Sequence, residues 1–126
     1  MRPKNRCYLV YALAPSEGNV RRSNHLFNDY ISDSRRGLCV YHDHFVRRPG
    51  GIAIFDVRSQ QEAKMLDDPG PLEGWELEVH GLDHSLTAVG LAAQMDYTLQ
   101  EYGGTTLAKL AAEEVPRKRH WWTQRT

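Results

Sequence analysis

The order in which two hydrophobic periodicities alternate along the chain constrains the fold most. Apolar or alternating runs typical of β-strands occur at 7–13, 38–47, 52–57 and 75–82. A segment with helical periodicity separates the first two runs, and a shorter helical segment separates the last two. This order, β-α-β-β-α-β, is the split βαβ pattern of ferredoxin-like folds. The sequence therefore predicts an α+β domain with an antiparallel sheet.

The two helical segments carry their own signals. In the second, Ser59 and Glu62 form a capping box, and the helix is expected to stop by Asp68 before Pro69. The first is expected to end at Gly37, after two arginines. Its apolar residues fall on one arc of a helix: Val20, Leu26, Phe27, Tyr30 and Ile31.

Two further helices are predicted at 85–102 and 106–115, before a tail at 116–126. The first of them is apolar on almost every side, and a helix of that kind is usually buried all round. In a chain of 126 residues, this indicates that a partner subunit covers it. The prediction is one domain, 1–126, with its core at 7–82 and C-terminal helices at 83–115.

Charge and cysteine content exclude several classes of protein. The 16 basic and 16 acidic residues give a net charge of +0, so neither nucleic acid nor an anionic membrane is expected as a partner. Cys7 and Cys39 lie in strand-like runs and are expected to be buried free thiols. The apolar run after the basic N-terminus is too short to span a bilayer, which predicts a cytoplasmic protein without an anchor.

Four segments together resemble the YCII-related family. They are the strand at 8–13, the Arg-Arg-Ser-Asn-His-Leu segment at 21–26, the Gly-Leu pair at 37–38, and the run at 50–57 with its following Ser-x-x-Glu-Ala and Asp-Asp-Pro. The resemblance implies a ferredoxin-like subunit that pairs with a second copy in a dimeric α+β barrel. It also implies a cleft beside the first helix with a His and an acidic residue as the active pair. The histidine corresponds to His25, and the acid nearest to the matched Gly37 is Asp33.

Residue spacing on the first helix points to the same place. His25 and Asp29 are four residues apart and can meet on one helix face. A carboxylate that holds an imidazole raises its basicity, as a general base requires. Arg21 and Arg22 are placed to hold an anionic substrate. The alternative is a solvated helix face with an incidental ion pair.

A second group of histidines lies on the strands. His42 and His44 share a strand face, an arrangement that binds zinc or iron when further ligands are present, and His80 is a candidate third ligand. The alternative is polar histidines on a half-exposed edge strand. No Cys-x-x-Cys or His-Glu-x-x-His pattern supports a metal, so the favoured prediction includes neither metal nor organic cofactor.

Aromatic side chains on the strands suggest a pocket for a flat organic molecule, with core packing as the alternative. Asp68 is a candidate only by analogy with the family. The tail mixes basic residues with Trp121 and Trp122, and we expect a docked or frayed tail rather than a nucleic-acid site, with a clamp of the paired tryptophans onto the partner subunit as a further alternative. The candidate pocket residues are Tyr11, Tyr41, Phe55 and Trp75.

The favoured function is a small homodimeric enzyme that catalyses proton transfer on an aromatic or carbonyl-bearing metabolite. Isomerisation, elimination and cyclisation all fit, so the class is lyase or isomerase. His25 serves as general base, Asp29 or Asp33 orients it, and His42 or His44 is the competing base. A non-catalytic dimeric binding or accessory module is the first alternative, because a fold does not determine a function. A metal-dependent enzyme that uses the histidine pair is the second.

Overall fold

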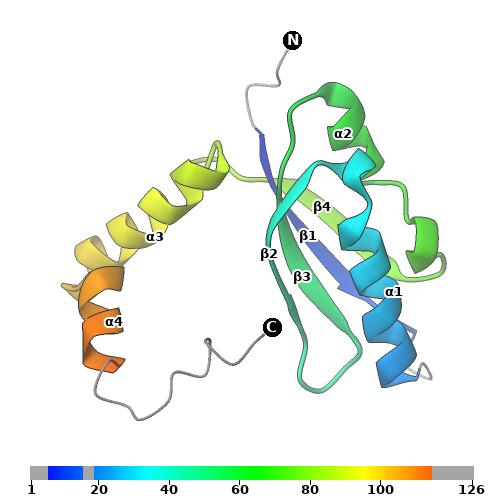
Figure 1. Ribbon diagram of the computed structural model, residues 1–126, viewed down its shortest axis with the longest axis horizontal. Helices are drawn as coiled ribbons and strands as arrows, with labels where there is room; N and C mark the ends of the chain where they lie inside the picture. Colours follow the sequence, from blue (N-terminus) through cyan, green and yellow to red (C-terminus); the bar gives the residue numbers. More distant parts are fainter. Residues whose placement is uncertain (1–5, 16–18, 115–126) are drawn as a thin grey trace.

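A four-stranded antiparallel sheet forms the centre of the molecule (Figure 1). The computed structural model describes residues 6–15 and 19–114. The strands run in the order β2-β3-β1-β4, and each neighbouring pair is antiparallel. Their bounds are β1 (Cys7–Leu13), β2 (Leu38–His44), β3 (Gly50–Asp56) and β4 (Glu76–Gly81). The predicted α+β class is confirmed, and the strand order is compatible with a ferredoxin-like fold.

The helices begin where polar side chains cap them. Ser59 accepts a hydrogen bond from the Glu62 backbone N–H at 3.1 Å, as predicted from the capping box. Asn19 caps the first helix and Thr87 the third in the same way. No helix within the described ranges is long and apolar enough to cross a membrane. The helices are α1 (Val20–Ser32), α2 (Gln60–Met65), α3 (Ala88–Gly103) and α4 (Leu107–Glu114).

The first helix ends earlier than predicted. It stops at Ser32 because Asp33 takes an extended conformation and caps a short 3-10 turn, Ser34–Arg36. Gly37 closes that turn rather than the helix, with a left-handed φ of 91° that favours glycine. The chain therefore turns twice before it enters β2.

The sheet has one covered face. Strand partners form rows across the sheet, and successive rows point to opposite sides. The face toward α1 includes the rows His42-Ala53-Val10-Val79 and His44-Gly51-Ala12-Leu77. The buried core lies between this face and the helices: Val10, Ala12, Phe27, Tyr30, Ala53, Phe55, Val57, Leu66 and Leu72.

A β-bulge interrupts the alternation of β2. An unbroken strand would place Cys39 on the same face as Tyr41 and Asp43, but the register shifts between Cys39 and Tyr41. The extra residue of a bulge reverses the alternation. Cys39 therefore packs against the core on the same side as His42 and His44.

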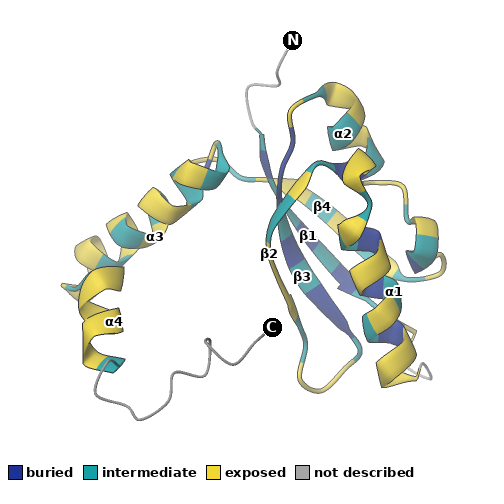
Figure 2. Ribbon diagram, in the orientation of Figure 1, coloured by how far each residue is buried: buried dark blue, intermediate teal, exposed yellow. Residues whose placement is uncertain are grey.

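The other face of the sheet, which we call the open face, has no helix packed along it among the described elements. Figure 1 shows α3 and α4, together called the arm, leading away from the sheet on the side opposite α1. Within the single chain α3 is not buried: Figure 2 shows exposed residues along the arm, and Val89 and Tyr102 are each 81% exposed. Coverage by a partner stays a prediction.

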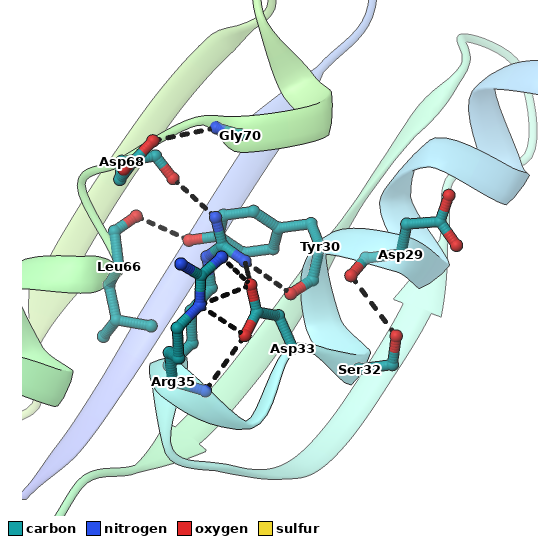
Figure 3. Close-up of polar contacts among 9 residues, drawn as sticks. Asp29, Tyr30, Ser32, Asp33, Arg35, Leu66, Asp68 and Gly70 are labelled. Atoms are coloured by element: carbon teal, nitrogen blue, oxygen red, sulfur yellow. Dashed lines mark hydrogen bonds and ion pairs between the residues drawn. The ribbon is translucent and has the colours of Figure 1, made fainter.

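A buried arginine, Arg36, ties α1 to the segment after α2. Figure 3 labels the residues around it, among them Tyr30, Asp33 and Asp68. The Arg36 side chain is 1% exposed, and its guanidinium lies 4.1 Å from the centre of the Tyr30 ring. It donates to the carbonyl oxygens of Tyr30 at 3.2 Å and Asp68 at 2.9 Å, and to Asp33 Oδ2 at 3.2 Å. The Tyr30 hydroxyl in turn donates to the Leu66 carbonyl, and burial raises the Tyr30 pKa to about 12. These bonds hold the C-terminal end of α1 against the core.

We predict that Arg36→Ala lowers the free energy of unfolding by about 3–5 kcal/mol, because it leaves a cavity and strips buried carbonyl oxygens of their donor. Urea unfolding followed by circular dichroism measures the change. Arg35→Ala is the matched control: its side chain is 71% exposed, and we expect a far smaller loss. Equal losses in the two variants would contradict the structural role of Arg36.

Candidate functional site

The exposed side of α1 carries the site predicted from the sequence. Ser23, Phe27 and Tyr30 are the buried residues of this amphipathic helix. On the solvent side, Arg21, His25 and Asp29 follow one another at intervals of one turn, and each is exposed. The sheet fixes the orientation of α1, so these three side chains form a continuous polar ridge.

Two depressions flank this ridge, and His25 lines both. The first has a volume of about 580 Å³, and the second about 490 Å³. Both open broadly to solvent. The first is lined by Asn19, Arg21, Arg22, His25, Leu26 and Asp29, and the second by Val20, Arg21, Asn24, His25 and Asn28. An imidazole, two guanidinium groups and a carboxylate thus surround one shallow space.

The carboxylates predicted to orient His25 are placed differently. His25 and Asp29 make no hydrogen bond or ion pair to each other, although both lie in the described part of the chain. Asp33 binds Arg35 at 2.6 Å and Arg36 at 3.2 Å, and hydrogen bonds from Arg35 hold its pKa well below the usual range. Asp33 is therefore an ionised structural group at the end of α1, two turns from His25.

His42 and His44 lie at the seam between β2 and α1. Their ring centres are 5.6 Å apart, and the His44 ring lies edge-on to Phe27, also at 5.6 Å. Burial lowers the His44 pKa, and His42 lowers it further, while Asp43 opposes the shift. The Nδ1 atom of His44 is buried and has no hydrogen-bond partner within residues 6–15 and 19–114. His44 is thus favoured as a neutral imidazole.

Gly51 permits this arrangement. It stands opposite His44 in the sheet, and a Cβ atom there would overlap the Asp43 carbonyl oxygen and lie 3.0 Å from the Phe27 ring. The missing side chain lets the Phe27 ring approach the sheet beside His44.

His80 does not join the histidine pair within one chain. It lies on β4, the edge strand opposite β2, and its partner Leu9 places it on the open face. There it lies 3.0 Å from Glu78. No group of three His, Cys, Asp or Glu side chains suited to a metal occurs in the described ranges. A metal site that uses His42 and His44 would therefore need a further ligand from outside the described residues of this chain.

The remaining candidates divide between the two faces. Tyr11 and Tyr41 are on the open face, where the ring centres of Tyr11 and Phe45 are 5.5 Å apart. Phe55 is buried in the core, and Trp75 stacks on Phe27 at 6.4 Å. The four aromatic residues therefore do not line one pocket.

Asp68 has a local structural role. Its carbonyl accepts from Arg36, and its carboxylate accepts the Gly70 N–H at 3.0 Å. Asn19 was missed as a lining residue of the first depression. An asparagine before a helical apolar pattern is an N-cap signal, and this signal would have placed it at the helix entrance. The basic and tryptophan residues of the tail lie outside the described residues.

A scan against protein-family models found no match, and a search of curated proteins found no similar sequence. The resemblance to the YCII-related family therefore stays a prediction.

We predict that the His44 imidazole titrates below pH 6.5 in the folded protein, because burial and the neighbouring His42 disfavour its charged form. Its contribution to stability is then complete above the unfolded pKa and is lost as pH falls toward the folded pKa. Nitrogen-15 NMR of the imidazoles measures the midpoint. His42→Ala should raise the midpoint toward 6.5; a wild-type midpoint above 6.5 would contradict this environment.

Proposed function

We propose that this protein is a cofactor-independent enzyme that transfers a proton on a small anionic molecule bearing a carbonyl or aromatic group. One observation carries the proposal: His25, Arg21, Arg22 and Asp29 line the same depression on α1. Guanidinium groups bind carboxylates by charge and by paired hydrogen bonds. An imidazole beside the bound anion is within the class of groups that act as general bases near neutral pH.

The residues would divide the work as follows. Arg21 or Arg22 holds the carboxylate of the substrate. This contact keeps the carbon atom adjacent to the substrate's carbonyl group close to His25. His25 takes the proton from that carbon, and the electron pair moves to the carbonyl oxygen as an enolate. Return of the proton to another carbon completes an isomerisation, and loss of a leaving group completes an elimination. Asp29, one turn away, stabilises the imidazolium through its charge.

We also propose that the working unit is a homodimer in which the open faces of two copies meet in an α+β barrel. The open face has partly exposed Leu9, Tyr11, Ile52 and Ile54 at its centre. When a second sheet removes apolar surface of this kind from water, the free energy falls and association is favoured. A net charge of +0 gives two copies little reason to repel each other.

A non-catalytic anion-binding module is the second candidate. The observation in its favour is that no carboxylate within residues 6–15 and 19–114 holds the His25 ring and that the depression is open to solvent. The arginines would then bind the ligand while His25 contributes only a hydrogen bond.

Exchange of carbon-bound hydrogen in D2O tests for proton transfer directly. Proton NMR would follow the wild-type protein with a panel of aromatic and 2-oxo carboxylic acids. We expect exchange of the hydrogen next to the carbonyl in at least one compound. His25→Ala should slow it at least about 100-fold, the lower range for a lost general base. Arg21→Ala with Arg22→Ala should raise KM more than it lowers kcat.

His84→Ala is the matched control, because His84 is 73% exposed and lies outside both depressions. Binding without any exchange would support the module instead. If neither His25→Ala nor His44→Ala changes the exchange rate, the assignment of the base is wrong.

A further inference from the structure

The open face combines an apolar centre with acidic edges. One row across it is Asp43-Ile52-Tyr11-Glu78, and the next is Tyr41-Ile54-Leu9-His80. Glu76 adds a further carboxylate on β4, opposite Leu13. The central residues are partly exposed, and Glu76 and Glu78 are exposed. Neither row contains a lysine or arginine, so a ligand for this face should be apolar and cationic together.

The arm starts at this face. Asp56, at the end of β3, accepts the N–H of Ala88 at the start of α3, 2.9 Å away, and pairs with Arg6 at 2.9 Å. The backbone N–H of Arg6 also donates to the Leu86 carbonyl at 3.1 Å. Asp56 is only 5% exposed, so these bonds fix the direction in which α3 leaves the sheet. The end of the arm therefore lies on the side of the open face, as Figure 1 shows.

The last twelve residues, 115–126, have the composition that the open face requires. They include Arg117, Lys118 and Arg119, followed by Trp121 and Trp122. They begin directly after Glu114, the last residue of α4. Trp121 is the seventh residue after Glu114, and seven extended residues span at most about 25 Å. A sheet four strands wide is about 15 Å across at the usual strand spacing, so the segment is long enough to cross it.

We propose that residues 115–126 dock on the open face of their own chain. Trp121 and Trp122 cover the apolar centre formed by Leu9, Tyr11, Ile52 and Ile54. The three cations lie against the carboxylates of the edge strands. Tryptophan supplies a large apolar area, and its indole N–H still finds acceptors at the polar edges.

The groove between α3 and α4 is a poorer match for the same segment. It has a volume of about 360 Å³ and offers apolar contacts, but no residue that lines it is acidic. The lining residues are Leu91, Gln94, Met95, Thr98, Leu99, Leu107 and Leu110. None of these lining residues carries a carboxylate, whereas the edge strands of the open face carry Asp43, Glu76 and Glu78, so charge complementarity with the lining favours the open face.

The effect of this docking on association rests on the proposed homodimer, because the second copy would pack on the same open face. Segment 115–126 and a second copy then compete, and the segment regulates association. Only the fraction of chains with a free open face can dimerise, which weakens the apparent affinity.

Tryptophan fluorescence of the full chain tests the docking. A Trp121→Phe/Trp122→Phe chain gives the spectrum of Trp75 alone, and subtraction isolates the two tail tryptophans. We expect their emission in the wild type to be blue-shifted and shielded from acrylamide, while light scattering at the same low concentration gives the monomer mass. Glu76→Lys with Glu78→Lys should shift the emission to that of the urea-unfolded chain.

The matched control is Glu73→Lys with Glu101→Lys, which makes the same change of charge at exposed positions away from the open face. Emission like that of the unfolded chain in the wild type would overturn the inference. The inference would also be overturned if the tryptophans were shielded from acrylamide and their emission did not change in the Glu76→Lys/Glu78→Lys variant. That result would place the segment in the groove of the arm.

Sedimentation equilibrium tests the competition. Trp121→Ala with Trp122→Ala should lower the dissociation constant of the dimer at least about tenfold, because the open face is freed. An unchanged or higher constant would overturn the competition and point to a segment that clamps the second copy. If no chain dimerises at any concentration, the proposed homodimer fails, and the fluorescence result alone decides whether the segment docks.

Discussion

The buried guanidinium of Arg36 is the contact on which the rest of the structure depends. It stacks on Tyr30 and bonds carbonyl oxygens at the end of α1 and in the segment after α2. Gly70 leaves room for it, since a Cβ there would lie 2.8 Å from Nη2. Removing a charge from water is costly unless hydrogen bonds replace the lost hydration. The carbonyl oxygens of Tyr30 and Asp68 and the Asp33 carboxylate supply that replacement for the two terminal nitrogens, and these bonds hold the end of α1 against the core.

The orientation of α1 in turn decides which chemistry faces solvent. With Phe27 and Tyr30 inward, the opposite side presents Arg21, His25 and Asp29 around a shallow depression. The same helix partly buries His44 against Phe27. One packing arrangement thus gives two histidines distinct environments, one exposed and one shielded. A shielded, neutral imidazole and an exposed one suit different roles, because only the exposed group reaches a ligand on the surface of α1.

The two faces of the sheet differ in what covers them. The covered face is closed by helices and supplies the core. The open face keeps apolar side chains within acidic edges, and the arm is fixed to its end through Asp56 and Ala88. None of the described helices covers this surface, and for that reason we propose that another segment or another copy packs on it.

The sequence by itself determined the element order, the capped start of α2 and the face of α1 that carries His25, because all three follow from local spacing and propensity. It placed two arginines before Gly37 and contained nothing to distinguish one from the other. Only the tertiary structure separated Arg36 from Arg35, because burial depends on the distant Asp68 carbonyl. Likewise, the bulge in β2 arises from its pairing with β3. The α3 helix is exposed because none of the described strands packs against it. Contacts between residues far apart in the chain decide such features, and no local pattern encodes them.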